Sequence, residues 1–114
     1  MSERDDRLPM HQMLEHAREA VAIIEGRSRS ELETDRVLRF ALAYLVQTVG
    51  EAATRVSREG QARYPEIPWV KAIGTRHRMV HGYDRIDFDV LWDTISDDLP
   101  GLIAALERAL STTR

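Results

Sequence analysis

Hydrophobic residues recur at intervals of three and four along the first quarter of the chain. This spacing predicts an amphipathic helix over residues 7–25, with Gly26 as a natural stop. The hydrophobic positions in question are Leu8, Met10, Met13, Leu14, Ala17, Ala20, Val21 and Ile24. The preceding residues 1–6 are mostly charged, and we expect them to form a flexible N-terminus beside a single domain spanning residues 7–112.

A second and longer run of hydrophobic positions predicts a central helix that continues into the region of Arg58. Much of its circumference is apolar, which is typical of a helix at the centre of a bundle or on an oligomer face. Two starts are open, because Ser30 with Glu33 has the form of a capping box and Thr34 is a rival N-cap. Gly50 lies in the interior, where glycine costs about 1 kcal/mol relative to alanine. We therefore expect another helix to approach closely there.

We predict a loop over residues 59–67, because the prolines at positions 65 and 68 prevent a helix from continuing through this segment. Pro68 suits the first turn of a third helix, which we expect to carry Trp69 as an apolar anchor and to end near Gly82. Asp87 is a suitable N-cap for a fourth helix.

Near the C-terminus, Pro100 and Gly101 interrupt the hydrophobic spacing. Either the fourth helix kinks there, or a fifth helix follows with Asp97 or Asp98 as its cap. No segment alternates strictly between apolar and polar residues, so no strand is predicted. The pattern as a whole predicts an all-α bundle of four to five helices.

The composition of the 114-residue chain is globular, with 43% hydrophobic and 31% charged residues. The absence of cysteine excludes disulfides and thiolate metal sites. No segment resembles a signal peptide or reaches the ~20 apolar residues of a membrane span, so we expect a soluble, cytoplasmic protein. The net charge of −3 argues against a general polyanion binder, although the middle of the chain is basic and the following segment acidic.

The residues with the richest chemistry lie together, from Arg76 to Tyr83, where two arginines, two histidines and a tyrosine occur within eight positions. Arginine grips phosphate through a planar fork of donors, and histidine exchanges protons near neutral pH. Arg76 and His81 are thus candidates for RNA cleavage without a metal, in which the 2′-hydroxyl attacks the phosphate; DNA would not be cut. On an ideal helix they lie about 140° apart. They converge only if the helix tightens or ends between them, or if the partner residue comes from another chain.

Other interpretations of these residues remain open. Arg76 is also compatible with a surface ion pair, and His81 with a histidine stabilised by a helix C-terminus. His77 and His81 have the spacing of a helical metal-binding pair, but no Cys or flanking Glu supplies a third ligand. Tyr83 is compatible with simple packing. Glu51 is either a solvated charge or a partner of Arg76 across two helices.

Several linked motifs extend this reading to nearly the whole chain. In chain order they are Leu8 with Met13-Leu14, Val49-Gly50-Glu51-Ala52, Ile67-Pro68-Trp69, Arg76 to Tyr83, Ile86-Asp87, Val90-Leu91-Trp92, and Asp98-Leu99-Pro100 with Leu102. Together they resemble the HepT-like toxins, a branch of the HEPN superfamily with an Arg-x4-His-x-Tyr signature. The resemblance covers residues 7–110.

The resemblance implies an all-α, up-and-down, HEPN-like bundle that acts as the metal-independent ribonuclease toxin of a two-component system. It implies a homodimer in which Arg76 and His81 of both chains meet in one cleft, with His77 and Arg78 available for RNA phosphates. It implies no cofactor, and as partner an MntA-like minimal nucleotidyltransferase antitoxin. That partner would neutralise the toxin by attaching AMP to Tyr83, which adds charge and bulk beside Arg76.

The chain departs from the family pattern at one position, where His77 replaces the Asn that usually follows the motif arginine. Two other functions therefore stay open. The first is a non-catalytic, dimeric helical module that binds a minimal nucleotidyltransferase. The second is a structural helical dimer with no ligand.

Overall fold

The computed structural model describes the backbone of residues 3–81 and 85–112 and the side chains of residues 5–75 and 86–111. Its elements are α1 (Glu3–Ile24), α2 (Glu31–Thr34), α3 (Arg36–Thr54), α4 (Arg58–Arg63), α5 (Trp69–Met79), β1 (Val80–His81), β2 (Arg85–Ile86), α6 (Phe88–Asp93), the π-helical segment η1 (Thr94–Asp98) and α7 (Leu99–Thr112). The predicted all-α bundle is confirmed. No helix in the described part of the chain is long and apolar enough to cross a membrane.

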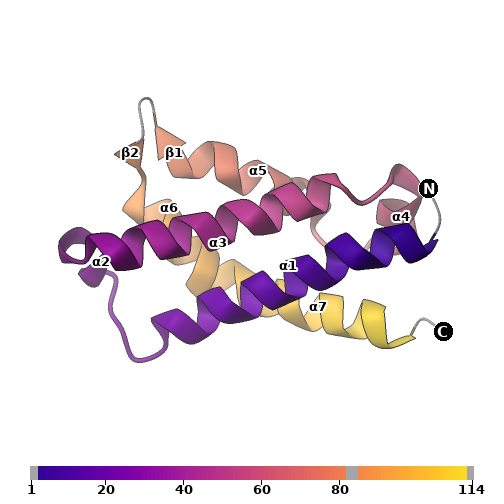
Figure 1. Ribbon diagram of the computed structural model, residues 1–114, viewed down its shortest axis with the longest axis horizontal. Coiled ribbons are helices and arrows are strands. Elements are labelled where there is room, and N and C mark those ends of the chain that lie inside the picture. The colour runs from indigo at the N-terminus through magenta and orange to yellow at the C-terminus, as the bar shows by residue number, and fades with distance from the viewer. Residues whose placement is uncertain (1–2, 82–84, 113–114) are drawn as a thin grey trace.

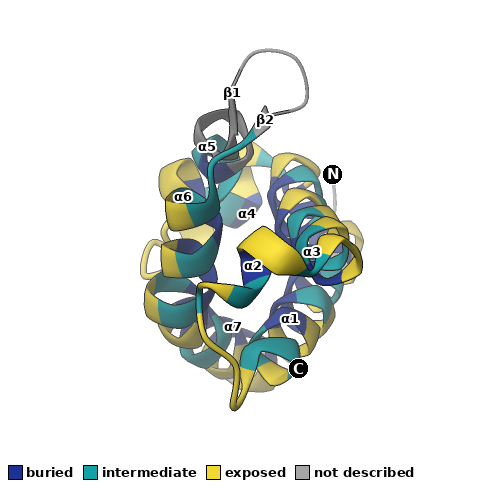
Figure 2. Cartoon of the chain, turned by 90° about the vertical axis from the view of Figure 1, so that its left-hand side faces the viewer, coloured by how far each residue is buried: buried dark blue, intermediate teal, exposed yellow. Residues whose placement is uncertain are grey.

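The long helices lie side by side along the longest dimension of the molecule, and α3 occupies the middle (Figure 1). It packs against α1 on one flank and α5 on the other, while α7 covers the remaining side of α1. The interior is apolar, and Figure 2 shows the buried residues turned toward the bundle axis. Its fully buried large side chains include Met10, Met13, Leu42, Ile67, Leu91, Ile95 and Leu106.

The N-terminal segment is more ordered than the sequence suggests. Helix α1 begins at Glu3 and contains Pro9, so the expectation of a flexible segment over residues 1–6 is wrong for residues 3–6. The physical reason is Asp6, whose buried carboxylate accepts hydrogen bonds from the backbone N–H and the hydroxyl of Ser57 at 2.8 and 2.7 Å. These bonds fix the first turns of α1 to the opposite end of α3.

The start of the central helix also differs from both predicted caps. Ser30 makes no side-chain cap bond, and Glu33 instead pairs with Arg29 at 2.9 Å, so the capping box does not form. The short helix α2 ends at Thr34, and Asp35 caps α3 by accepting a hydrogen bond from the Leu38 N–H at 3.0 Å. A carboxylate facing the free N–H groups of a first turn is the stronger cap here.

The predicted loop over residues 59–67 contains the short helix α4. Its cap is Ser57, whose hydroxyl accepts from the Gly60 N–H at 3.0 Å while donating to Asp6. After this helix, the indole N–H of Trp69 donates to the carbonyls of Gln61 and Tyr64. These bonds fix the buried Trp69, the predicted apolar anchor, at the start of α5.

The C-terminal helices form one continuous helical path through α6, η1 and α7. The N–H of Leu99 donates to the carbonyl of Thr94, five residues earlier, which widens the turn. This turn immediately precedes Pro100, whose ring would collide with the carbonyl of residue 96 in a regular α-helix. The wide turn therefore lets the helix continue through Pro100 without a break. At the other end of this helical run, Asp87 caps α6 as predicted.

Two short strands replace the end of the third helix. Helix α5 stops at Met79, and β1 pairs antiparallel with β2, with Val80 opposite Ile86 and His81 opposite Arg85. The helix therefore ends three residues before Gly82, close to the predicted end, whereas the expectation of no strand is wrong at this point. A two-residue strand is too short to produce a readable alternation of apolar and polar residues.

Candidate functional site

The segment that carries the candidate catalytic residues runs from the last turn of α5 into β1. Arg76, His77 and Arg78 lie within the helix, and His81 lies in the strand. The helix ends between Arg76 and His81, so the 140° separation of a continuous helix does not apply to this pair. This is one of the conditions under which the two residues can converge.

The side chains of residues 76–85 lie outside the described part of the structure, as does the backbone of Tyr83. The roles of Arg76, His77, Arg78, His81 and Tyr83 therefore stay predictions from the sequence. The strand assignment does bear on the alternative metal site. Because His81 lies in β1, it does not stand one helical turn after His77, so the backbone does not give the two residues the helical spacing that this alternative requires. Among the described residues, no group of three His, Asp or Glu side chains is arranged to hold a metal ion.

Glu51 lies half-buried on α3, and the turn of that helix sets its direction. Val46 and Val49 line the contact with α5, and at 100° per residue Glu51 points about 140° and 160° away from them. It lies nearer in angle to Thr48 and Arg55, which hydrogen-bond to α1. Pairing of Glu51 with Arg76 stays a prediction from the sequence, and this direction does not favour the pairing within one chain.

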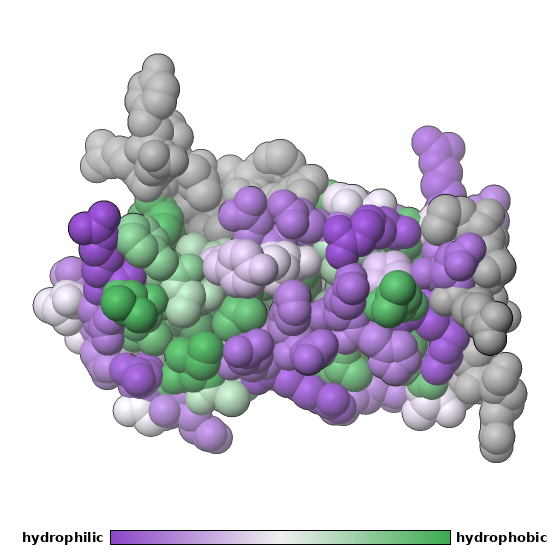
Figure 3. All heavy atoms as spheres, in the orientation of Figure 1, coloured by the Kyte–Doolittle hydropathy of each residue, from purple (hydrophilic) through white to green (hydrophobic). Residues whose placement is uncertain are grey.

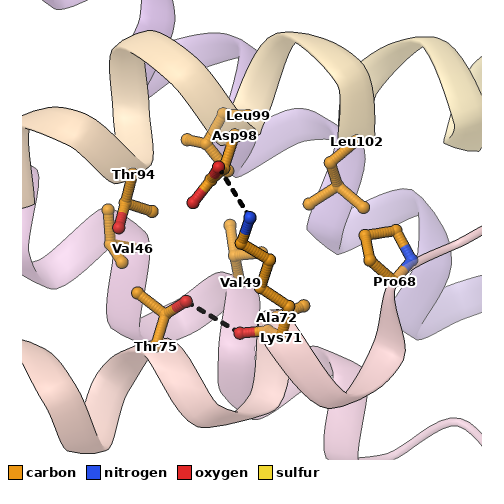
Figure 4. A pocket seen from close by; sticks show the side chains of 10 residues that line it. All are labelled: Val46, Val49, Pro68, Lys71, Ala72, Thr75, Thr94, Asp98, Leu99 and Leu102. Atoms are coloured by element: carbon orange, nitrogen blue, oxygen red, sulfur yellow. Dashed lines mark hydrogen bonds and ion pairs between the residues drawn. The ribbon is translucent and has the colours of Figure 1, made fainter. Parts of the chain in front are cut away.

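The base of α5 is held by an ion pair that the sequence did not indicate. Lys71 Nζ lies 3.0 Å from Asp98 Oδ1 in η1, and Figure 4 shows this pair across the mouth of a small, largely apolar hollow between α3, α5 and α7. Within it, the buried Thr75 donates to the Lys71 carbonyl at 2.7 Å. Thr75 directly precedes Arg76, so these contacts set the position of the helical turn that carries the candidate site.

The other end of the site segment is held through β2 and α6. Phe88 begins α6 two residues after β2, and the guanidinium of Arg39 lies 5.1 Å from the centre of its ring. Arg39 also donates to the Leu32 carbonyl at 2.7 Å. The guanidinium of Arg29 donates hydrogen bonds to the carboxylates of Glu33 and Asp89, and these bonds raise the pKa of Arg29. Arg29 thereby joins α2 to α6. The segment is thus anchored on both sides by α3 and its neighbours.

Comparison with known proteins gives a consistent result. The family profile described as "Ribonuclease HepT-like" matches residues 13–109. The chain is 30% identical over 99 residues to the "Probable ribonuclease HepT" of Thermococcus cleftensis, covering 83% of this chain and 90% of that protein. It is 25% identical over 107 residues to the "Putative RNase MJ1380" of Methanocaldococcus jannaschii, covering 94% and 98%. No solved structure gives a significant match.

Proposed function

Because the chain belongs to the HepT-like ribonuclease family, we propose that it is the metal-independent ribonuclease toxin of a type VII toxin–antitoxin system. The observation that carries the proposal is the placement of the motif on the backbone. Arg76 lies in the last turn of α5 and His81 beyond the helix end. An arginine and a histidine with a helix end between them can address one phosphate.

In the proposed reaction, the 2′-hydroxyl of RNA attacks the adjacent phosphorus. A new P–O2′ bond forms while the P–O5′ bond breaks, which leaves a 2′,3′-cyclic phosphate and a free 5′-hydroxyl. His81 moves a proton at the attacking or leaving oxygen. Arg76 stabilises the charge that develops on the phosphate oxygens, while His77 and Arg78 bind neighbouring phosphates. The active form is a homodimer, and its place of action is the cytoplasm.

Neutralisation is proposed to act on Tyr83. An MntA-like minimal nucleotidyltransferase transfers AMP from ATP to the tyrosine hydroxyl and releases pyrophosphate. The added phosphate occupies the position of an RNA phosphate near Arg76 and excludes the substrate. Intact-mass measurement after co-expression with such an enzyme tests this step. We expect added nucleotide on the wild-type chain and none on Tyr83→Phe.

The test of the ribonuclease itself is expression of the chain alone, with His81→Ala as the matched control. We expect growth arrest and trimmed RNA from the wild-type chain only, and undiminished cleavage by the purified protein in EDTA. Equal cleavage by wild type and His81→Ala, inhibition by EDTA, or cleavage of DNA would each contradict the mechanism.

The alternative function is a non-catalytic module that binds a nucleotidyltransferase. Two features favour it. His77 replaces the family's usual asparagine, and acidic residues such as Asp93 and Asp97 are exposed after the site segment, where they repel RNA. In that case the chain binds the nucleotidyltransferase, but neither it nor His81→Ala trims RNA.

A further inference from the structure

The outward face of α3 carries two exposed aromatic rings one helical turn apart. Phe40 and Tyr44 are 49% and 64% exposed, and Val37, three residues before Phe40, is 78% exposed. Four residues separate the two rings, so they stand on one side of the helix, about 6 Å apart along its axis. Figure 3 shows hydrophobic residues gathered over this N-terminal part of α3, whereas the opposite end of the same face is more hydrophilic.

Two guanidinium groups accompany the first of these rings. The Cζ atoms of Arg36 and Arg39 lie 5.2 and 5.8 Å from the centre of the Phe40 ring. Neither arginine forms an ion pair with any carboxylate in the described part of the chain. The face therefore combines exposed aromatic rings with two positive charges that no carboxylate of these residues neutralises.

The acidic side chains around the start of α3 are already engaged. Arg29 binds the carboxylates of both Glu33 and Asp89, and the carboxylate of Asp35 serves as the N-cap of α3. Glu51 lies on the same side of α3 as the two rings, but two helical turns beyond the second one. The end of the face that carries the first ring is therefore its cationic end, which suits an anionic partner.

This cationic end lies close to the site segment. The guanidinium of Arg39 that flanks Phe40 also stacks on Phe88, which begins α6 two residues after β2. Figure 1 shows β1 and β2 at the same end of the molecule as the start of α3. A polymer bound at the two strands can therefore continue onto the exposed face of α3.

We propose that Arg36, Arg39, Phe40 and Tyr44 form a track for single-stranded RNA, in which one base stacks on each ring and the arginines bind backbone phosphates. Stacking on aromatic rings and arginine contacts to phosphate are the means by which proteins bind single strands of any sequence. A stable protein–protein interface buries about 800 Å² on each partner, which is more than the three apolar side chains expose, whereas a base needs only one ring face. The track rests on the proposed function and extends it, because it binds the substrate outside the reacting segment.

Stacking is tested by binding an eight-nucleotide single-stranded RNA in the His81→Ala background, which leaves the RNA uncut. We expect Phe40→Ala and Tyr44→Ala each to raise the Kd about 5–100-fold, as expected for the loss of one stacked base. The matched control is Leu8→Ala, since Leu8 is as exposed as Tyr44, at 64%, but lies on α1. Phe40→Trp should keep the affinity and Phe40→Leu should not, because leucine is apolar but has no ring face.

The phosphate contact is tested through the salt dependence of the same binding. Each phosphate contact to a single strand adds about 0.7 to the slope of log Kd against log salt concentration. We expect Arg36→Ala to lower the slope by this amount. Arg58→Ala, which removes an exposed arginine on α4 at the opposite end of the molecule (Figure 1), should leave the slope unchanged. Circular dichroism confirms that each variant folds.

Substrate length separates the track from the reaction. In the active protein, Phe40→Ala should raise the KM for the eight-nucleotide RNA and leave cleavage of a dinucleotide unchanged. Equal RNA binding by Phe40→Ala and Leu8→Ala, or by Phe40→Leu and Phe40→Trp, would overturn the track and leave the ribonuclease standing. Loss of RNA binding only together with a fall in mass in solution would also overturn it, because the face would then bind protein.

The proposed function can fail separately from the track. RNA binding that depends on Phe40 in a chain that cleaves no RNA would keep the track and remove the proposed enzyme. A wild-type chain that binds no RNA would overturn both.

Discussion

Asp6 and Ser57 lie 51 positions apart in the sequence, yet the Asp6 carboxylate accepts two hydrogen bonds from Ser57. The Ser57 N–H donates to one carboxylate oxygen at 2.8 Å and the Ser57 hydroxyl donates to the other at 2.7 Å. Asp6 is only 1% exposed, so water cannot replace these bonds. The contact joins the start of α1 to the turn between α3 and α4.

Removing this carboxylate should be costly. We expect Asp6→Ala to lower the free energy of unfolding by about 2–4 kcal/mol, because hydrogen bonds to a charged group are lost and a buried N–H is left without a partner. Asp6→Asn should cost less, since its amide oxygen keeps one acceptor. Urea unfolding measures both. The control is Glu19→Ala, an exposed acid on the same helix, which should change stability by no more than about 0.5 kcal/mol. Equal effects of Asp6→Ala and Glu19→Ala would show that the contact contributes nothing.

Gly60 lies against the same contact and should not tolerate a side chain. A Cβ at this position would collide with the Asp6 carboxylate and lie 2.9 Å from Val56 Cγ1. We expect Gly60→Ala to destabilise the fold by about 1–3 kcal/mol through overpacking. Gly74, within α5, has open space where a Cβ would stand, so Gly74→Ala should stabilise by up to about 1 kcal/mol through helix propensity. Thermal melts of the two variants should therefore shift in opposite directions.

The sequence predicts the bundle well because the helices have strong periodicity. The same periodicity says nothing of polar contacts between distant segments. Asp6 stands in a charged stretch that suggests disorder, and only the folded chain shows that Ser57 lies opposite it. The break at Asp35 is missed for a different reason. Three residues suited to cap a helix, Ser30, Thr34 and Asp35, fall within six positions, and their local chemistry alone does not rank them.

For the site, the sequence locates the segment but not its backbone. Gly82 is a strong helix stop, so the predicted end falls there, whereas α5 ends at Met79 because β1 pairs with β2. A pairing of two residues on each strand leaves no periodic signal. The Lys71–Asp98 pair that holds α5 is also invisible in the sequence, since any of several acidic residues in that region is an equally good candidate.

Arg39 should stabilise the junction between β2 and α6. Its guanidinium lies 5.1 Å from the Phe88 ring centre and donates to the Leu32 carbonyl at 2.7 Å. We expect Arg39→Ala to lower the free energy of unfolding by about 1–3 kcal/mol and to speed amide hydrogen exchange over residues 85–93. Arg39→Lys should recover only part of the loss, because an ammonium lacks the planar face that stacks on the ring.

The matched control for this junction is Arg58→Ala. Arg58 is exposed on α4 and has no polar partner among the described side chains. It should change neither the stability nor the exchange at the junction. If Arg39→Ala left exchange over residues 85–93 at the wild-type rate, the stacking on Phe88 would not be what holds this segment.

Arg76 should contribute to the chemical step and not only to RNA binding. We expect Arg76→Ala to lower kcat by about 10²–10³-fold, which is typical when a group that stabilises developing charge is removed. Arg76→Lys should recover part of the rate, because it keeps the charge but loses the two-handed grip on phosphate. Single-turnover cleavage of a short RNA at saturating enzyme separates the two effects. A change confined to KM would assign Arg76 to binding alone.

His77 should make RNA binding depend on pH. A histidine side chain in water has a pKa of about 6.5, so an imidazole that faces RNA phosphates can be charged at pH 5.5 and neutral at pH 8. A charged His77 adds one cation beside two arginines, so RNA should bind more tightly as the pH falls.

The binding experiment is carried out with His81→Ala as the background protein, because this substitution prevents cleavage of the RNA and removes the second imidazole of the motif. In that background, His77→Asn should weaken binding of a short RNA by about 3–10-fold at pH 5.5 and low salt, as expected for one lost phosphate contact, and have no effect at pH 8. A difference of the same size at both pH values would mean that His77 acts through shape or hydrogen bonding, as the family's asparagine does, and not through its charge.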